Sequence, residues 1–334
     1  MTTGGNGVNP LILDRLRSFL AVAAILLVPA NLSRADTAVL VALPSEQSAL
    51  SREVRIVGQS VELAQHRVSI GYHKGEKLYL VRTGAGNLNS AMVTQALLTR
   101  YKIDRIISVG VAGYIGDGGN GTTEILRQAQ DDNAVRKTDP WRIGDIFIAT
   151  NVVNHQEGTE TPGGFQPAEK LASTQSRSAE YWKKCEVLRS NAVEITRALL
   201  GNSPAPRTND TTETLRQAQG DKVGEGPNAD GRRGIASIRE GRLVSGDSFI
   251  ASTAKRKWLR ETFHADAVDM VSAGIARVCE ANGVPCVIIR TLSDNADESA
   301  SAAFAKFVQS GKEKEPVTVP IALRLIEQVA PPHP

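Results

Sequence analysis

The chain has 334 residues, of which 41% are hydrophobic and 22% charged, and these proportions are ordinary for a globular protein. Its formal net charge of +3 comes without a basic block, so nucleic acid is not expected as a partner. The three cysteines, Cys185, Cys279 and Cys286, have no zinc-type spacing, and their odd number gives no disulfide framework. Neither a metal centre nor a disulfide scaffold is therefore expected.

Residues 1–35 have the layout of a secretory signal peptide or a short membrane anchor. Arg15 and Arg17 precede the apolar run Phe19–Val28, and small residues follow up to Ala35. This order of basic region, apolar core and cleavage site is typical of export signals. Ten apolar residues are few for a membrane span. We expect a periplasmic or secreted protein if the signal is real, and a cytoplasmic one if the start codon has been placed too far upstream.

From residue 37 onward, short apolar runs predict strands, and apolar residues at helical spacing predict helices. The expected strands are Thr37–Leu43, a hairpin over His66–Gly84 that turns near Lys74 to Glu76, Arg105–Gly113, Asp145–Val153, Gly241–Phe249, Ala265–Val271 and Val284–Leu292. The expected helices are Asn87–Lys102 with Asn87 or Asn89 as N-cap, Ser178–Leu200, Ser272–Gly283 ending at Asn282-Gly283, Glu298–Phe307 and Pro320–Ala330. Alternation of this kind favours a layered α/β domain with a mostly parallel sheet.

A repeated phrase interrupts this pattern. The stretch "TTEILRQAQDD", Thr122–Asp132, returns as "TTETLRQAQGD", Thr211–Asp221, with nine of eleven positions identical. Two copies in dissimilar surroundings do not make a solenoid, which needs at least three stacked units. Both copies lie in polar, Gly-rich stretches, where added loop length costs little folding free energy. We therefore expect disordered loop insertions at about 116–138 and 202–233 in one domain that spans 36–334.

Three polar clusters end or flank the apolar strands, where α/β folds place their functional sites. They contain Glu46 after the first strand, the stretch Val244–Ser252, and the stretch Arg290–Asp297. A carboxyl such as Asp294 at a half-buried strand end can remain protonated and act as a general acid. The alternative is that Asp294 only caps the helix that follows it.

Taken together, several motifs identify a family. They are "RTGAGNLNSA", "SVGVAG" followed by "IGDIFIA", "VSGDSFI", "AVDM" followed by "AGIARVC", and "VPCVIIRTLSD". In this order and spacing the chain resembles the purine nucleoside phosphorylase superfamily, and most of all its hydrolase branch, the 5'-methylthioadenosine/S-adenosylhomocysteine nucleosidases. The resemblance runs from Thr37 to the C-terminal helix, the two insertions excepted. It implies a single three-layer αβα domain with a central mixed sheet, a homodimer, and no cofactor.

The resemblance also implies a reaction, the hydrolysis of a purine nucleoside at its N-glycosidic bond with water as co-substrate. The family's acid falls on Asp294, which would protonate or hydrogen-bond N7 of the leaving purine. Its base falls on Glu46, which would take a proton from the attacking water, and Arg290 falls close to that water and the acid. Bond cleavage builds positive charge on the ribose and negative charge on the purine, so carboxyl groups on opposite sides of the bond suit the chemistry.

The remaining residues of the implied site bind substrate. Phe249 would stack on the base, backbone groups of Ile250 would contact its edge, and Met270 would pack on the sugar. The full implied binding set is Gly113, Phe249, Ile250, Asp269, Met270, Val271 and Ser293. Two positions depart from the family. Val271 replaces a Glu that holds the ribose hydroxyls, with Asp269 on the same strand face as a partial substitute, and Val111 replaces a serine near the water.

Three functions stay open at this point. Hydrolysis is favoured over phosphorolysis because Ser108 lies where the phosphorylases carry a phosphate-binding Arg, and because Glu46 occupies the place of the water's base. An exported nucleoside-binding relative without turnover is suggested by Val271, Val111 and the signal-like N-terminus. The retention of Asp294, Arg290 and Glu46 argues against that third interpretation.

Overall fold

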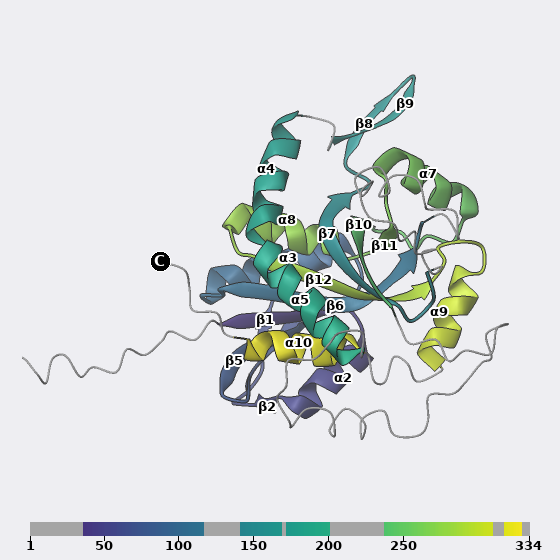
Figure 1. Ribbon diagram of the computed structural model, residues 1–334. Coiled ribbons are helices and arrows are strands. Elements are labelled where there is room, and N and C mark those ends of the chain that lie inside the picture. Colours follow the sequence, from purple (N-terminus) through teal and green to yellow (C-terminus); the bar gives the residue numbers. More distant parts are fainter. Residues whose placement is uncertain (1–35, 117–140, 169–171, 201–236, 310–316, 329–334) are drawn as a thin grey trace, which may run out of the picture. The chain divides into compact units, whose positions relative to one another are not determined.

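The computed structural model describes residues 36–116, 141–168, 172–200, 237–309 and 317–328, with the side chains of 172–177 left out (Figure 1). The described residues belong to one compact unit. The expected signal at 1–35 lies outside the described residues, as do both copies of the repeat and nearly all of the insertions predicted around them. Within the described residues, no helix is long and apolar enough to cross a membrane.

The centre of the unit is a ten-stranded mixed sheet. Its strands follow the order β11 (Ala267–Asp269), β10 (Ile238–Ser245), β7 (Ile146–Asn154), β12 (Cys286–Asp294), β6 (Arg105–Tyr114), β1 (Thr37–Val41), β5 (Glu76–Arg82), β4 (His66–His73) and β2 (Arg55–Ile56), with β3 (Val61–Leu63) also paired to β4. The pairs β1–β5, β1–β6, β6–β12 and β7–β10 are parallel, whereas β7–β12 is antiparallel.

Strand β6 makes a third pairing that closes part of the sheet on itself. Beyond its parallel partners β1 and β12, its last residues pair antiparallel with β11, where Val268 faces Gly113 and Ala267 faces Tyr114. The strands β6, β12, β7, β10 and β11 therefore form a closed ring. The ring brings the carboxyl ends of β6, β11 and β12 together, and these are the strand ends that carry the motifs "VAGY", "VDM" and "TLSD".

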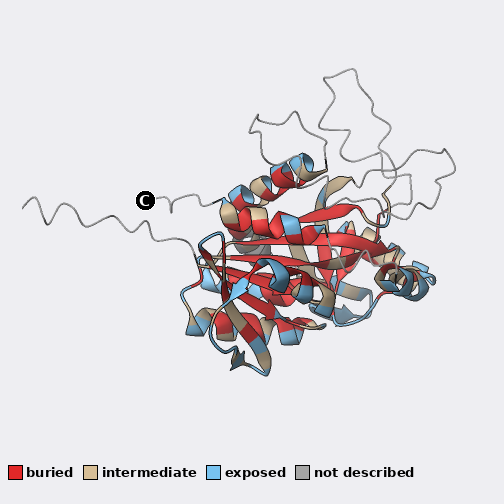
Figure 2. Ribbon diagram, turned by 90° about the horizontal axis from the view of Figure 1, so that it is seen from below, coloured by how far each residue is buried: buried red, intermediate tan, exposed pale blue. Residues whose placement is uncertain are grey.

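Helices cover both faces of the sheet, as alternating side chains along the strands require. On one face, Val39, Ile107 and Ile289 pack with α2 (Pro44–Glu53), α5 (Glu186–Leu199) and α10 (Thr318–Glu327). On the other, Ala38 and Ile288 pack with α3 (Asn87–Arg100), α4 (Ala172–Lys184) and α8 (Ser272–Asn282). Figure 2 shows the buried strands between helices whose outer sides are exposed. The three-layer αβα prediction with a mixed sheet is confirmed.

A smaller apolar cluster lies at the closed end of the sheet. Leu259 and Phe263 of α7 (Thr253–Phe263) pack there with residues of β10 and β11 and with Ile250 and Ala296. The helix α9 (Ala300–Gln309) follows β12, and the hairpin of β8 (Gly158–Thr161) and β9 (Gly164–Pro167) follows β7. This cluster joins the segment after β10 to the segment after β12, and both segments belong to the candidate site.

The structure corrects three local predictions. The helix expected over Ser178–Leu200 is two helices that meet at Cys185, because Tyr181 packs on one face of the sheet and Leu188 on the other. The strand expected over Gly241–Phe249 ends at Ser245, where His155 N–H closes the last backbone pair at 3.1 Å. The N-cap of α3 is Gly86, with φ of 102°, instead of Asn87 or Asn89.

Candidate active site

Asp294 is the last residue of β12 and is almost fully buried. Its Oδ2 accepts a hydrogen bond from Ser293 Oγ at 2.8 Å, and its Oδ1 accepts one from the backbone N–H of Ala296 at 2.9 Å. Burial raises the pKa of this carboxyl above its ordinary value, although both hydrogen bonds oppose the shift. Asp294 can thus carry a proton closer to neutral pH than an exposed Asp, as a general acid must.

The structure does not support Asp294 as the cap of the next helix. Helix α9 begins at Ala300, and it is Asp297 that accepts hydrogen bonds from the N–H and hydroxyl of Ser299 there. Asp294 instead lies opposite Gly113 of β6. A Cβ atom at Gly113 would lie 2.8 Å from Asp294 Oδ1, so the glycine is required by the close approach of the carboxyl.

Glu46 is the third residue of α2 and is also almost fully buried. The chain turns at Pro44, so the Glu46 side chain folds back over the end of β1, where its Oε2 accepts from Leu43 N–H at 2.9 Å and Ala42 N–H at 3.1 Å. Strand β1 pairs in parallel with β6, and β6 pairs in parallel with β12. Glu46 and Asp294 therefore lie at the same end of the sheet. Helix α2 was not among the sequence predictions, because its sequence "PSEQSALSRE" has a weak apolar face.

Arg290 lies four residues before Asp294 on β12 and is fully buried. Its Nε donates to Asp269 Oδ2 at 2.8 Å, an ion pair shielded from solvent. Its two terminal nitrogens donate to the carbonyl and hydroxyl of Ser108, the hydroxyl of Ser272 and the carbonyl of Ile289. The guanidinium group therefore links β12, β6 and the segment that leads into α8.

The residues after β11 differ from the sequence-based description. Strand β11 ends at Asp269, and Val271 is already the N-cap of α8, so Asp269 and Val271 do not share a strand face. The Asp269 carboxylate turns towards Arg290 and accepts further hydrogen bonds from Ser272. Met270 is half-buried and its carbonyl accepts from Gly86 N–H at 2.9 Å, while the Val271 side chain is buried.

Phe249 and Ile250 follow β10. The Phe249 side chain is 43% exposed, and its ring centroid lies 5.9 Å from that of Phe304 on α9. Ile250 is buried in one apolar cluster with Ala296, the residue whose N–H binds Asp294. The structure thus brings the segment that contains Phe249 and Ile250 next to the loop that follows Asp294. That Phe249 itself faces the same pocket as Asp294 stays a prediction.

The sequence analysis did not identify a polar cluster that connects the start of α3 with the segment that follows β10. Asp247 accepts from the N–H of Asn87 and donates its own N–H to Gln156 Oε1 at 2.8 Å, and Asn87 Oδ1 accepts from Ser245 Oγ and Gly274 N–H. Next to it His155 is buried, and neither of its ring nitrogens has a hydrogen-bond partner among the described residues. Burial lowers the pKa of His155 to about 4, with Lys255 adding to the shift. A lone histidine after an apolar strand gives no sequence signal of such burial.

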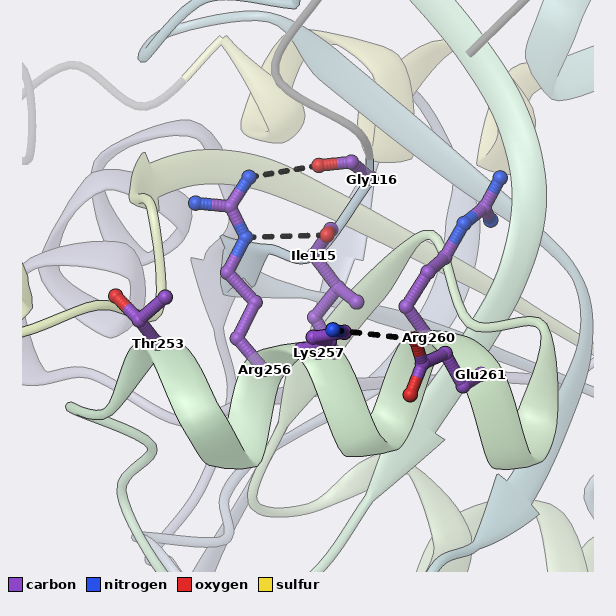
Figure 3. Close-up of a pocket in the computed structure, with 7 residues that line it drawn as sticks. All are labelled: Ile115, Gly116, Thr253, Arg256, Lys257, Arg260 and Glu261. Carbon is purple, nitrogen blue, oxygen red and sulfur yellow. Dashed lines mark hydrogen bonds and ion pairs between the residues drawn. The ribbon is translucent and has the colours of Figure 1, made fainter. Parts of the chain in front are cut away.

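The cavity in Figure 3 lies elsewhere, between the end of β6 and α7, with a volume of about 270 Å³. Its basic side chains are already engaged: Arg256 donates to the carbonyls of Ile115 and Gly116, and Lys257 pairs with Glu261. It contains none of the residues implied for the site. Among the described residues, no group of three or more His, Cys, Asp and Glu side chains could hold a metal ion.

A buried carboxyl of raised pKa at the end of a central strand, a second carboxyl at the same sheet end and a mixed sheet between helices define an α/β enzyme equipped for acid–base chemistry. Comparison with known proteins gives the family. The chain belongs to the phosphorylase superfamily, whose sequence profile matches residues 36–327.

Its curated relatives are nucleosidases. The chain is 23% identical over 249 residues to the aminodeoxyfutalosine nucleosidase of Helicobacter pylori strain 26695, covering 72% of this chain and 79% of that one. It is 27% identical over 268 residues to the 5'-methylthioadenosine/S-adenosylhomocysteine nucleosidase of Actinobacillus succinogenes, covering 78% and 89%.

Solved structures give the same fold. The futalosine hydrolase of Helicobacter pylori superimposes with a TM-score of 0.59 at 18% identity, covering 89% of this chain and 99% of that one. The 5'-methylthioadenosine/S-adenosylhomocysteine nucleosidase of Helicobacter pylori superimposes with a TM-score of 0.59 at 19% identity, covering 89% and 100%.

Proposed function

We propose that this protein hydrolyses the N-glycosidic bond of a purine nucleoside of the 5'-methylthioadenosine/S-adenosylhomocysteine type and releases the purine base. The observation that carries the proposal is Asp294, a buried carboxyl of raised pKa held by Ser293 at the end of β12. A leaving purine needs a proton donor at that place. The curated relatives support the reaction class, since they are named as nucleosidases.

In this mechanism the C1'–N9 bond breaks and its electron pair moves into the purine. Asp294 donates its proton to N7, so the base leaves without a net negative charge. Glu46 accepts a proton from water as the water oxygen bonds to C1', and its carboxylate also stabilises the cationic sugar. General acid and base groups of this kind contribute roughly 10²–10⁴-fold each.

The neighbouring residues bind the substrate in this proposal. Phe249 stacks on the base from its partly exposed position, and backbone groups of Ile250 contact the purine edge. Met270 packs on the sugar, and Gly113 leaves the room that Asp294 requires. A solved relative supports the choice of substrate class: an Asp-to-Asn variant of the Helicobacter pylori nucleosidase, 20% identical with a TM-score of 0.58, holds 5'-methylthioadenosine in its active site.

Phosphorolysis is less well supported. Ser108 stands where the resemblance places the phosphate-binding Arg of the phosphorylases, and it is buried with its hydroxyl bound to Arg290 at 3.1 Å. A serine hydroxyl already engaged in this way brings no positive charge to a phosphate. Water is therefore the better nucleophile for this site.

Product analysis tests the proposal. The purified protein is incubated with methylthioadenosine, adenosylhomocysteine, adenosine or inosine, with and without phosphate, and the products are separated by chromatography. We expect free purine and free sugar, independent of phosphate. Sugar 1-phosphate formed only with phosphate would establish a phosphorylase. Tight binding without any product would establish a nucleoside-binding protein without turnover.

We also propose that the protein is a homodimer, that it does not bind nucleic acid, and that it is exported with removal of residues 1–35. The dimer is supported by Leu88 and Met92, large apolar side chains one turn apart on α3 that are 70% and 44% exposed. Light scattering on the purified protein tests the dimer. N-terminal sequencing of the mature protein tests the export, and an intact Met1 in the cytoplasm would contradict it.

A further inference from the structure

Asp247 carries an exposed carboxylate beside the segment that follows β11. It lies two residues after the end of β10 and two residues before Phe249. The backbone just ahead of it is attached to β11, because the Gly246 N–H donates to the Asp269 carbonyl at 3.1 Å. Asp247 therefore leaves the sheet next to Met270, the residue that packs on the sugar in the proposed function.

One oxygen of this carboxylate is anchored and the other is not. Asp247 Oδ1 accepts from the Asn87 N–H at the start of α3, where the helix dipole favours an acidic group. A Cβ atom at Gly86 would lie 3.6 Å from this oxygen, and the Gly86 N–H donates to the Met270 carbonyl at 2.9 Å. Within the part of the chain that the structure describes, Asp247 Oδ2 has no hydrogen-bond or ion-pair partner. The carboxylate is thus oriented from one side and available to a ligand on the other.

The segment that follows β11 has no carboxylate oxygen of its own to offer a ligand. Asp269 Oδ2 accepts from Arg290 Nε at 2.8 Å and from the Ser272 hydroxyl. Asp269 Oδ1 accepts from the backbone N–H groups of Val271 and Ser272 at 3.3 and 3.1 Å. Each oxygen thus accepts two hydrogen bonds, as many as its lone pairs allow, and position 271 is apolar and buried. At this place it is Asp247 that supplies an accessible carboxylate oxygen.

A carboxylate accepts hydrogen bonds and donates none, and each of its oxygens has two lone-pair sites. In a purine nucleoside, the 2'- and 3'-hydroxyls on adjacent ribose carbons are a matching pair of donors. We propose that Asp247 Oδ2 binds these ribose hydroxyls, while the Asn87 N–H holds Oδ1 in place. The identity of the ligand as a nucleoside rests on the proposed function. The inference adds that the site favours ribonucleosides over deoxyribonucleosides.

The test measures binding to the full-length protein by titration calorimetry. The ligands are a 9-deaza analogue of methylthioadenosine, whose carbon–carbon glycosidic bond water does not cleave, and its 2'-deoxy and 3'-deoxy forms. In the wild type, the loss of a hydroxyl that Asp247 holds should weaken binding about 10- to 100-fold, the range for a hydrogen bond to a charged group. Asp247→Ala should weaken binding of the ribose form by a similar factor. In this variant the deoxy forms should bind within about 3-fold of the ribose form, because the two losses concern one contact.

Two further variants separate sugar binding from helix capping. Asp247→Asn keeps an oxygen for the Asn87 N–H, since Asn and Asp are equally good caps. It loses the charge, so the ribose form should bind about 5- to 10-fold more weakly. Asp104→Ala is the matched control: it also removes an exposed carboxylate that accepts a backbone N–H, that of Asp36 at 2.8 Å, but at the amino ends of β1 and β6. It should bind all three ligands like the wild type.

If Asp247→Ala weakens all three ligands equally while Asp247→Asn weakens none, Asp247 only caps α3 and the inference is overturned. A wild type that binds none of the three ligands, or binds all three equally, would overturn it as well. Purine release from methylthioadenosine is assayed separately. Release without selectivity for ribose would leave the proposed function standing and reject this inference. The expected selectivity without release would support this inference and reject the hydrolase.

Discussion

Lowering the pH should destabilise this protein through His155, and the size of the effect follows from the structure. Burial lowers the pKa of His155 to about 4, whereas an unfolded histidine titrates near about 6.5. The folded state therefore binds fewer protons than the unfolded state between these values, and stability falls as the pH falls through this window. Between pH 7.5 and 4.5 the loss amounts to roughly 2–3 kcal/mol of unfolding free energy.

Urea unfolding at pH 7.5 and 4.5 measures this, with His155→Leu as the perturbation and His264→Asn as the control. His264 is exposed, and its φ of 52° at the end of α7 suits Asn. The difference in stability between the two pH values should shrink by roughly 2–3 kcal/mol in His155→Leu and stay at the wild-type size in the control. Comparing variants matters because Asp294, whose pKa is raised, contributes with the opposite sign. An unchanged difference in His155→Leu would refute the assignment of a buried, neutral His155.

Further expectations concern the reaction. Asp294→Asn and Glu46→Gln should each lower purine release by at least about 10²-fold while methylthioadenosine still binds by calorimetry; unchanged release in both would mean that the site is misplaced. Activity should fall as the pH rises through the raised pKa of Asp294, because the acid must be protonated, and a pH–rate profile of kcat checks this. Gly113→Ala should impair kcat, since its Cβ would meet Asp294 Oδ1; full activity would show that the carboxyl can move. Val271→Glu should destabilise the protein and raise KM, measured by urea unfolding and initial rates, because it buries a new charge.

Much of the fold could be predicted from local pattern. The hairpin turn falls at Lys74 and Gly75, both with positive φ, and α8 ends at Gly283 with φ of 66°, as the turn and stop signals indicated. The break at Cys185 could not be predicted, because it depends on which sheet face each half of the sequence covers. Helical periodicity is the same on either face, so the sequence alone indicates one continuous helix.

In the candidate site, too, local sequence pattern predicted some features, whereas others depend on how distant segments pack together. Strand ends predicted the positions of Asp294 and Glu46, since parallel neighbours place their carboxyl ends at one edge of a sheet. The partners of Arg290 could not be predicted, because they depend on register. Arg290 lies opposite Gly110, and its guanidinium group packs directly over that glycine. No spacing within either strand indicates that contact.

The burial of Arg290 constrains the residues around it. A guanidinium group without solvent needs a carboxylate and a full set of acceptors, since an unpaired buried charge is strongly destabilising. Asp269 supplies that carboxylate, and Ser108 and Ser272 complete the acceptors. A second carboxylate at the buried position 271 would find no unsatisfied donor on Arg290. The buried Val271 adds no charge beside this network, and its presence is compatible with an intact acid at Asp294.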